Sequence, residues 1–367
     1  MTTPPTAGPA TRVGHGTIKA QIAAILRAWG MRPDHVETTA TLMADADLRG
    51  IDSHGLSMLT LYDAWRRENL TLADTRVEIV RETPISVLVD GGGGLGYVPG
   101  MLAVEAGIRK ARETGICVAA VRNSAHFGAA GYYTRAIAAA GLIGMAATSC
   151  PRVQVVPTHG AEPKLSTDPW SFAAPAGRNP PFVLDMATST TAAGKVRNRA
   201  NEGRPIPSGW AVDAAGQPVT DAEQVFRIGA FLTPLGATPE LASHKGYGLA
   251  VMVNILTTCL SGGSLVTSPG HPFRVPGTQS LNHYFQIMDP ALFRPEGDFR
   301  ADVDELVDSL RATRPIDPSR PVLVAGDPEE AERERRSREG IAVEPGLARK
   351  IEAIARDCGA RFLLGGD

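Results

Sequence analysis

The sequence predicts a mixed α/β fold (a mixed sheet of the α+β type) with an N-terminal helical sub-domain. Apolar residues recur at helical spacing through residues 17–69, and beyond residue 84 short strand-like apolar runs alternate with amphipathic stretches. The 367 residues, 43% of them hydrophobic, suffice for two or more sub-domains that share one large core. We expect a helical sub-domain at 1–80 with a disordered leader at 1–14, a central α/β core at 81–265, and a C-terminal segment at 266–367 that packs back on the N-terminal part.

Helical periodicity predicts the elements of the N-terminal sub-domain in order. Ile18, Ile22 and Leu26 mark one face of a helix over 17–30. A second helix is expected over 34–50, with Asp34 as its N-cap, and a third over 55–69. The first part of the chain is therefore expected to be entirely helical.

The rest of the chain alternates between strand-like and helix-like stretches. We expect strands over 84–90, 115–122 and 141–149, separated by helices over 101–114 and 129–140. Residues 163–235 are rich in Pro and Gly and predict short strands and long loops, the usual place for site residues. Further helices are expected over 245–262, 300–312 and 328–339, and residues 322–330 predict a strand, a turn and an acidic helix start.

Charge and hydropathy exclude several classes of protein. The formal net charge is −2 with Lys and Arg spread along the chain, so no basic face predicts a nucleic-acid or membrane-surface partner. No apolar run reaches the roughly 18–20 residues that cross a bilayer, and the Thr- and Pro-rich N-terminus does not resemble a signal peptide. Widely spaced cysteines, and histidines without ligand spacing, argue against a disulfide framework or a metal site. These features predict a cytoplasmic protein.

A glycine-rich segment, DGGGGLGYVPG at 90–100, contains a possible phosphate-binding motif. Gly91, Gly93 and Gly96 fit G-x-G-x-x-G, which in a Rossmann fold cradles a pyrophosphate. The next strand, however, ends in Arg122-Asn123 rather than in an acidic residue, and Pro99 is expected to delay the start of the following helix. We therefore favour a permissive turn that lets the chain approach a neighbouring backbone.

Two histidines lie at polar, glycine-flanked ends of predicted elements. His54 lies in RGIDSHGL between two helices, and His126 lies in RNSAHFGAAGYY after a strand. Imidazole titrates nearest neutral pH, so it is the favoured donor of a proton to the alkoxide left by carbonyl reduction. On spacing alone, turn histidines with satisfied hydrogen bonds are an equally good interpretation.

Three further segments carry candidate site residues. Asp185 ends an apolar strand in FVLDMATST, where a carboxylate can orient an imidazole, bind a ribose or simply cap the next helix. Lys245 and two glycines open the helix in SHKGYGLA, where backbone amides and an ammonium suit a phosphate. The third segment is VLVAGDPEE at 322–330.

Taken together, RGIDSHG, RNSAHFGAAGYY, STDPW, DMATST with GK, HKGYGLA and AGDPEE closely resemble the ordered motifs of one family. This is the malate/L-lactate dehydrogenase family of the second type, which includes ureidoglycolate, sulfolactate and hydroxycarboxylate dehydrogenases, diketogulonate reductase and piperideine-2-carboxylate reductase. The resemblance covers residues 15 to 365. It implies a homodimer with a non-Rossmann nicotinamide-binding fold and a site near the subunit interface. The cofactor is NAD or NADP; we lean to NAD, because Arg197, Arg199 and His159 are only candidates for a 2′-phosphate clamp.

The resemblance also implies roles for individual residues. His54, His126 and Asp185 match catalytic positions, and either histidine can be the proton donor or acceptor. The cofactor-binding positions, which place the cofactor on the central core, are Ser149, Asp185, Met186, Ala187, Lys245, Ala325, Gly326 and Asp327. The substrate-binding positions are Ser53, Met58, Asn123, Thr167 and Asp168.

Two of these positions depart from the family's pattern. Many members carry Arg four residues after the S-H-G histidine, where this chain has Met58, and the G-T-N-P segment carries Asp168 in place of Asn. Losing a cation and gaining an anion both disfavour an anionic substrate, each by about 1–3 kcal/mol if desolvated. One branch of the family, hydroxycarboxylate dehydrogenases with bulkier substrates, also has Met at the first position. We hypothesise a larger, less acidic or amine-bearing substrate than malate.

The function predicted from the sequence is an NAD(P)-dependent oxidoreductase that interconverts a 2-hydroxy acid and a 2-oxo acid. A reductase of cyclic imines, of the pyrroline- or piperideine-2-carboxylate type, needs almost the same machinery and is the first alternative. A non-catalytic homologue that only binds the cofactor is the alternative from another class.

Overall fold

A computed structural model of the chain describes residues 10–227, 229–263, 265 and 279–365. Its centre is a seven-stranded sheet with the strand order β2-β3-β4-β10-β5-β6-β7. Only β3 and β4 are parallel, and every other neighbouring pair is antiparallel. The predicted mixed α/β fold is confirmed, and the sheet is not the doubly wound parallel sheet of a Rossmann fold. The strands are β2 (Glu78–Thr83), β3 (Ser86–Asp90), β4 (Ile116–Ser124), β5 (Ile143–Thr148), β6 (Trp170–Ala174), β7 (Phe182–Met186) and β10 (Leu281–Met288).

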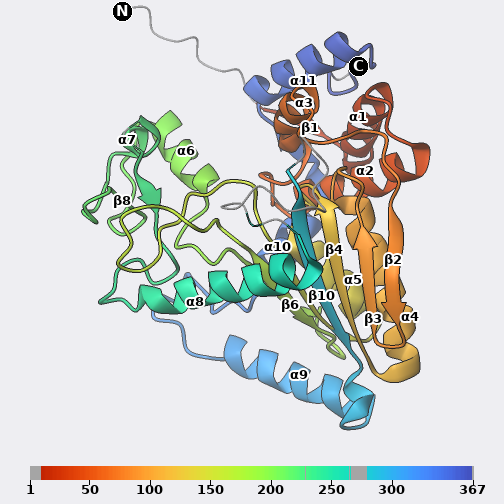
Figure 1. The fold of residues 1–367 in the computed structure, drawn as a ribbon. Helices are drawn as coiled ribbons and strands as arrows, with labels where there is room; N and C mark the ends of the chain where they lie inside the picture. The colour runs from red at the N-terminus through yellow and green to blue at the C-terminus, as the bar shows by residue number, and fades with distance from the viewer. Residues whose placement is uncertain (1–9, 228, 264, 266–278, 366–367) are drawn as a thin grey trace, which may run out of the picture.

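Helices surround this sheet, and the predicted ones are present with ends that shift by a few residues (Figure 1). Those of the main body are α1 (His15–Ala28), α2 (Pro33–Leu48), the 3-10 helix η1 (Leu56–Met58), α3 (Leu59–Arg67), α4 (Tyr97–Thr114) and α5 (Ala130–Ala139). Farther along the chain lie α8 (Ser243–Asn254), continued by the π-helix η2 (Ile255–Cys259), then the 3-10 helix η3 (Pro290–Leu292), α9 (Glu296–Arg311), α10 (Asp327–Glu339) and α11 (Pro345–Cys358).

Several local predictions differ from the structure. The second helix begins at Pro33 with Arg32, not Asp34, at its N-cap position. Helices at Ala193–Asn201 and Ala222–Arg227 lie within 163–235, where short strands and loops were predicted.

Helix α4 begins at Tyr97, so Pro99 does not delay it; Pro is tolerated in the first turn because its missing N–H would have no partner within the helix. The strand predicted at the start of 322–330 is wrong, since only a turn precedes α10, although Val183 N–H donates to Ala325 O there at 3.2 Å. No strand was predicted at β10, which is buried along most of its length.

The two ends of the described chain meet beside the N-terminal helices. Ile18, Ile22 and Leu26 of α1 are fully buried in the main core, against which the partly buried Phe362 packs. Strand β1 (Thr11–Val13) pairs with β11 (Ile341–Val343), and α11 packs on α1 and α3.

The division at residues 80 and 265 stays a prediction, although β10, which follows 265, belongs to the central sheet. Of the leader expected to be disordered at 1–14, residues 1–9 lie outside the described residues, whereas Thr11–Val13 is a strand.

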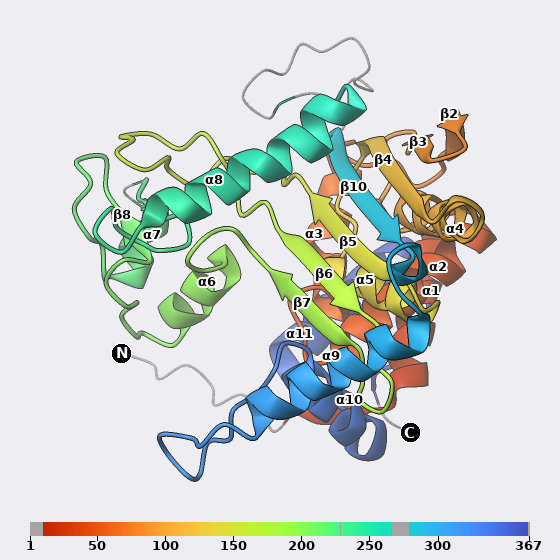
Figure 2. The ribbon, with the colours of Figure 1, turned by 90° about the horizontal axis from the view of Figure 1, so that it is seen from below.

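A small lobe stands apart from the N-terminal helices (Figure 1). It contains α6 (Ala193–Asn201), α7 (Ala222–Arg227) and the paired strands β8 (Ala211–Val212) and β9 (Phe231–Leu232). Its own apolar core includes Val155, Val196, Ile206, Val225 and Leu232. Seen from below, α8 runs from this lobe toward β10 (Figure 2). None of the helices described has the length and apolar character needed to cross a bilayer.

Candidate functional site

The two histidines singled out in the sequence lie together. His54 belongs to the loop between α2 and η1, and His126 to the loop between β4 and α5. Their rings stack with centroids 5.3 Å apart and an interplanar angle of 29°. Both residues are half-buried. Two imidazoles from segments far apart in sequence therefore form one pair.

The glycine-rich loop after β3 holds the segment that carries His126. Gly93 N–H donates to Asn123 O at 2.6 Å, and Gly96 N–H donates to His126 O at 2.9 Å. A Cβ on Gly96 would lie 2.6 Å from both Ala125 O and His283 Nε2, closer than real contacts allow. These amides bind protein carbonyls, so the preferred interpretation, a close approach of two backbones, is confirmed.

The Nδ1 atom of His126 has two hydrogen-bonding neighbours. Tyr62 Oη lies 2.7 Å away, and Gly128 N–H donates to the same nitrogen at 3.3 Å. Tyr62 Oη in turn lies 2.8 Å from Tyr97 Oη. Burial, helped by the neighbouring His54 and His283, holds the pKa of His126 well below its usual value. His126 is therefore a neutral ring at pH 7.

A buried carboxylate, that of Asp47, holds the loop that carries His54. Asp47 Oδ2 accepts from Leu56 N–H at 2.7 Å, and the carboxylate lies so close to Gly55 that a Cβ there would be 2.0 Å from Asp47 Oδ1. Burial raises the pKa of Asp47 to about 7 and lowers that of His54 to about 4. Ser53 Oγ lies 2.8 Å from His54 Nδ1.

Helix α10 holds the same loop from outside. Arg336 donates to Asp47 O at 2.8 Å and forms an ion pair with Asp52, whose Oδ2 lies 3.1 Å from Arg336 Nη2. The helix that follows the AGD turn thus fixes the loop of the S-H-G histidine.

The Asp185 and Ala325–Asp327 segments lie side by side. Asp185 Oδ2 accepts from Gly131 N–H at 2.7 Å at the start of α5, five residues after His126, and desolvation raises the pKa of Asp185 to about 6. A Cβ on Gly326, whose φ is +101°, would lie 3.4 Å from Val183 N. Asp327 pairs with Arg311 and accepts from Val324 N–H at 2.8 Å. Met186 and Ala187 follow Asp185 and are half-buried.

A second group of predicted residues gathers at the ends of β5 and β6. Ser149 Oγ accepts from Asn282 N–H at 3.0 Å, and Thr167 Oγ1 lies 3.5 Å from Cys150 Sγ. Asp168 is 1% exposed, and its Oδ2 accepts from Asn254 Nδ2 at 2.9 Å. Burial raises the pKa of Asp168 to about 6. Asp168 lines a pocket of about 240 Å³ whose other walls include Cys150, Ser166, Asn254 and the apolar Val153, Leu165, Val251 and Ile255.

The other predicted residues have no described contact with the two histidines. Lys245 is exposed in the first turn of α8, and no described contact joins it to the histidines. Asn123 Nδ2 donates to Asp90 at 2.8 Å at the end of β4, and its Oδ1 has no hydrogen-bond partner among the described residues. Met58 is partly buried against the main core. Arg197 and His159 belong to the region of the small lobe, where Arg197 lies over Phe226, 5.5 Å from the ring centroid.

Several residues that shape the site were missed in the sequence. Tyr62 and Asp47 lie within predicted amphipathic helices and carry no local signal for a site. Tyr97 belongs to the glycine-rich stretch, and His283 to the strand that was not predicted. His283 is fully buried, lies 2.7 Å from Thr148 Oγ1 and 2.9 Å from Ser124 Oγ, and stacks on Phe127.

Known proteins resemble this chain along nearly its full length. Residues 13–352 match the malate/L-lactate dehydrogenase family. The malate dehydrogenase of Pyrococcus abyssi is 36% identical over 348 residues, with 93% of each chain covered. The structure of malate dehydrogenase from Pyrococcus horikoshii OT3 has a TM-score of 0.86 at 31% identity, covering 99% of this chain and 100% of that one. The structure of Δ1-piperideine-2-carboxylate reductase from Pseudomonas syringae pvar. tomato has a TM-score of 0.82 at 26% identity, covering 94% and 99%. The chain therefore belongs to the malate/L-lactate dehydrogenase family and is an NAD(P)-dependent oxidoreductase acting on CH–OH groups.

Proposed function

We propose that the protein interconverts a 2-hydroxy acid and its 2-oxo acid, with His54 and His126 acting on the oxygen atom that gains or loses the proton. The observation that carries this proposal is the stacked pair itself, 5.3 Å between ring centroids, built from two remote loops. A low pKa keeps both rings neutral at pH 7, and a neutral imidazole is the form that accepts a hydroxyl proton.

The residues near Asp185 fit a nicotinamide dinucleotide. Asp185 uses Oδ2 for Gly131, and within the described part of the chain its Oδ1 has no partner, so it is available to a ribose hydroxyl. Gly326 has no side chain, and a Cβ at this position would lie against Val183 of β7. The absence of a side chain leaves room for the cofactor beside this backbone. When bound, the cofactor accepts hydride from carbon or supplies it. Ser149, Met186, Ala187, Lys245, Ala325 and Asp327 are the further proposed contacts.

The proposed substrate is larger and less acidic than malate, or bears an amine. The pocket beside Asp168 supports this, because its walls combine apolar side chains with a buried carboxylate. Lys164 also lines the pocket, but its ammonium is paired with Glu162 at 3.0 Å. Ser53, Met58, Asn123 and Thr167 complete the proposed substrate contacts. Two observations also support the second candidate, a cyclic imine reductase. One is the structural likeness to a piperideine-2-carboxylate reductase. The other is Asp168, whose carboxylate would stabilise a positively charged iminium.

We further propose NAD rather than NADP as the cofactor, a cytoplasmic location and a homodimer with the site near its interface. Arg197, a candidate for the 2′-phosphate, is engaged with Phe226 in the small lobe, which supports NAD. Leu241, Ile255 and Leu260, at or near α8 and η2, are more than half exposed, as expected for apolar side chains that a second subunit covers.

A substrate screen with both cofactors tests the proposal. It compares malate, aryl-substituted 2-oxo acids and a cyclic imino acid in the wild type, His54→Ala, His126→Ala and Asp168→Asn. We expect each alanine variant to lose at least about 100-fold in kcat, and Asp168→Asn to shift the ratio of kcat/KM toward malate by about tenfold. Full turnover in both alanine variants would falsify the mechanism. Wild-type activity on malate that equals activity on the bulkier substrates would refute the proposed substrate class.

A further inference from the structure

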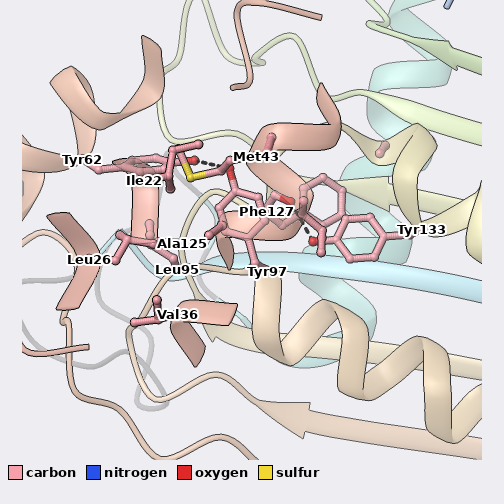
Figure 3. Close-up of a cluster of buried hydrophobic side chains, with 14 of the residues drawn as sticks. Ile22, Leu26, Val36, Met43, Tyr62, Leu95, Tyr97, Ala125, Phe127 and Tyr133 are labelled. Carbon is pink, nitrogen blue, oxygen red and sulfur yellow. Dashed lines mark hydrogen bonds between the residues drawn. The ribbon is translucent and has the colours of Figure 1, made fainter. Parts of the chain in front are cut away.

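The side chain of Tyr62 connects the catalytic pair to the buried core. Tyr62 is 1% exposed and comes from α3, and its hydroxyl lies 2.7 Å from His126 Nδ1 and 2.8 Å from the hydroxyl of Tyr97. Figure 3 shows Tyr62 and Tyr97 within the cluster of apolar side chains that includes Met43 and Phe127. Two phenol groups thus form a chain of hydrogen bonds that ends on one nitrogen of His126.

The direction of this chain follows from one amide. Gly128 N–H can only donate, and it points at His126 Nδ1, so that nitrogen must be an acceptor without a hydrogen of its own. Tyr62 then donates its O–H to Nδ1, and its oxygen accepts the O–H of Tyr97. Burial raises the pKa of both phenols, so both hydroxyls keep their hydrogens at neutral pH.

We propose that Tyr62 is a positioning residue that fixes His126 in the tautomer with its hydrogen on Nε2. His126 then offers an N–H to the substrate oxygen, and His54 is the base. This inference rests on the proposed function. His54 is free to take that role, because its Nδ1 faces Ser53 Oγ, a hydroxyl that can donate or accept, and the described residues provide no partner for its Nε2.

The proton balance of the step is then defined. In the oxidation direction the hydroxyl O–H bond breaks and its proton moves to His54 Nε2. An oxidised nicotinamide, when bound, would supply the acceptor for the hydride that leaves the C–H bond, so that protons and electrons balance. His126 Nε2–H stays bonded to its nitrogen and stabilises the negative charge that develops on the oxygen.

The surroundings of His126 favour this neutral role. Among the described residues, the titratable groups that face it are His54 from the α2–η1 loop, His283 from β10 and Tyr62 from α3, with Tyr97 from α4 bonded behind Tyr62. None of these groups is a carboxylate, the group that most often stabilises an imidazolium. Two neutral O–H and N–H donors on Nδ1 disfavour a proton there.

Tyr62→Phe tests the role, with Tyr284→Phe as the matched control. Tyr284 is also buried and donates its hydroxyl to Gln286 Oε1 at 3.0 Å, on the central strand β10. We expect Tyr62→Phe to lower kcat by about 10- to 100-fold with KM changed less than about threefold. Tyr97→Phe, which removes the donor to Tyr62, should show a smaller loss of kcat, and the control should retain wild-type kcat.

Nitrogen NMR of ¹⁵N-histidine-labelled protein gives a readout independent of turnover. The His126 signals are assigned by their loss in His126→Ala, and we expect a hydrogen on Nε2 and a bare Nδ1 in the wild type. In Tyr62→Phe only the longer bond from Gly128 N–H, at 3.3 Å, still favours a bare Nδ1, so part of the His126 population should move to the Nδ1–H tautomer. A wild-type His126 with its hydrogen on Nδ1 overturns the inference, and this measurement needs no folded variant of Tyr62.

The outcomes also separate this inference from the proposed function. If His54→Ala and His126→Ala retain turnover, the catalytic pair itself is refuted. If both lose turnover while Tyr62→Phe keeps the wild-type kcat and the Nε2–H tautomer, the role of Tyr62 alone is refuted.

Discussion

Replacing Asp47 by Asn removes an ionisable carboxyl group that the folded protein buries next to the His54 loop. Asp47 is 5% exposed and, among the described residues, accepts one short hydrogen bond, from Leu56 N–H. Asn keeps a carbonyl oxygen for that bond and has nearly the same volume, so the variant should fold in the same way. The two proteins then differ in whether residue 47 can ionise.

The size of the effect follows from proton linkage. The pKa of Asp47 is about 7 in the folded protein against an ordinary value of 3.8, so the folded state holds the proton more tightly than the unfolded state. The stability supplied by this proton is present at low pH and is lost as the pH rises through 7. From pH 5 to pH 8 the wild type should lose about 2–3 kcal/mol of unfolding free energy relative to Asp47→Asn.

Urea unfolding of both proteins at pH 5, 6, 7 and 8 measures this difference, and the contributions of other titrating groups cancel between them. Asp304→Asn is the control, because hydrogen bonds from Arg178 and Asn179 lower the pKa of Asp304. The stability that Asp304 supplies is lost only at pH values below its unfolded pKa, so its difference from the wild type should stay constant above pH 5. If the wild-type and Asp47→Asn curves run parallel from pH 5 to pH 8, the reasoning is refuted.

Two further substitutions test the glycine-rich loop and the AGD turn, which pack around the site. Gly96→Ala places a Cβ 2.6 Å from Ala125 O, and we expect a loss of about 2–3 kcal/mol of stability in thermal unfolding. Gly297→Ala is the control, because a Cβ there has nothing within 4 Å. Equal melting temperatures for the two variants would contradict the close packing at Gly96. Asp327→Ala removes the partner of Arg311 and of Val324 N–H, so we expect NAD(P)H to bind at least about fivefold more weakly in a fluorescence titration. An unchanged dissociation constant would argue against the AGD turn as a cofactor contact, and Asp317→Ala, in an exposed loop, should leave it unchanged.

Local periodicity was sufficient to predict most helices and the strands with uniform apolar runs. It failed at β10, whose sequence LNHYFQIM mixes polar and apolar side chains at positions that are nearly all buried. The polar ones are satisfied by distant partners, as when His283 binds Thr148 and Ser124. A sequence window does not contain those partners, so the strand cannot be recognised from its own pattern.

The site was predictable to the extent that its residues carry a local signature. His54 and His126 stand beside glycines and small polar residues, and this context was enough to single them out. Tyr62 and Asp47 occupy ordinary helical positions, and their importance arises only where α2, α3 and the β4–α5 loop pack together. Contacts of this kind depend on tertiary structure and leave no spacing to detect.

The insertion of β10 between β4 and β5 has a consequence for how the protein is made. Strands β4 and β5 are joined by one short helix, yet they pair with a segment more than 130 residues farther along, as in the bond between Ser149 and Asn282. Such non-local pairing slows folding. A nascent chain that has not reached residue 281 presents two open strand edges, which favour aggregation. Enzyme activity during refolding should therefore appear late, and only in polypeptides that extend beyond this strand.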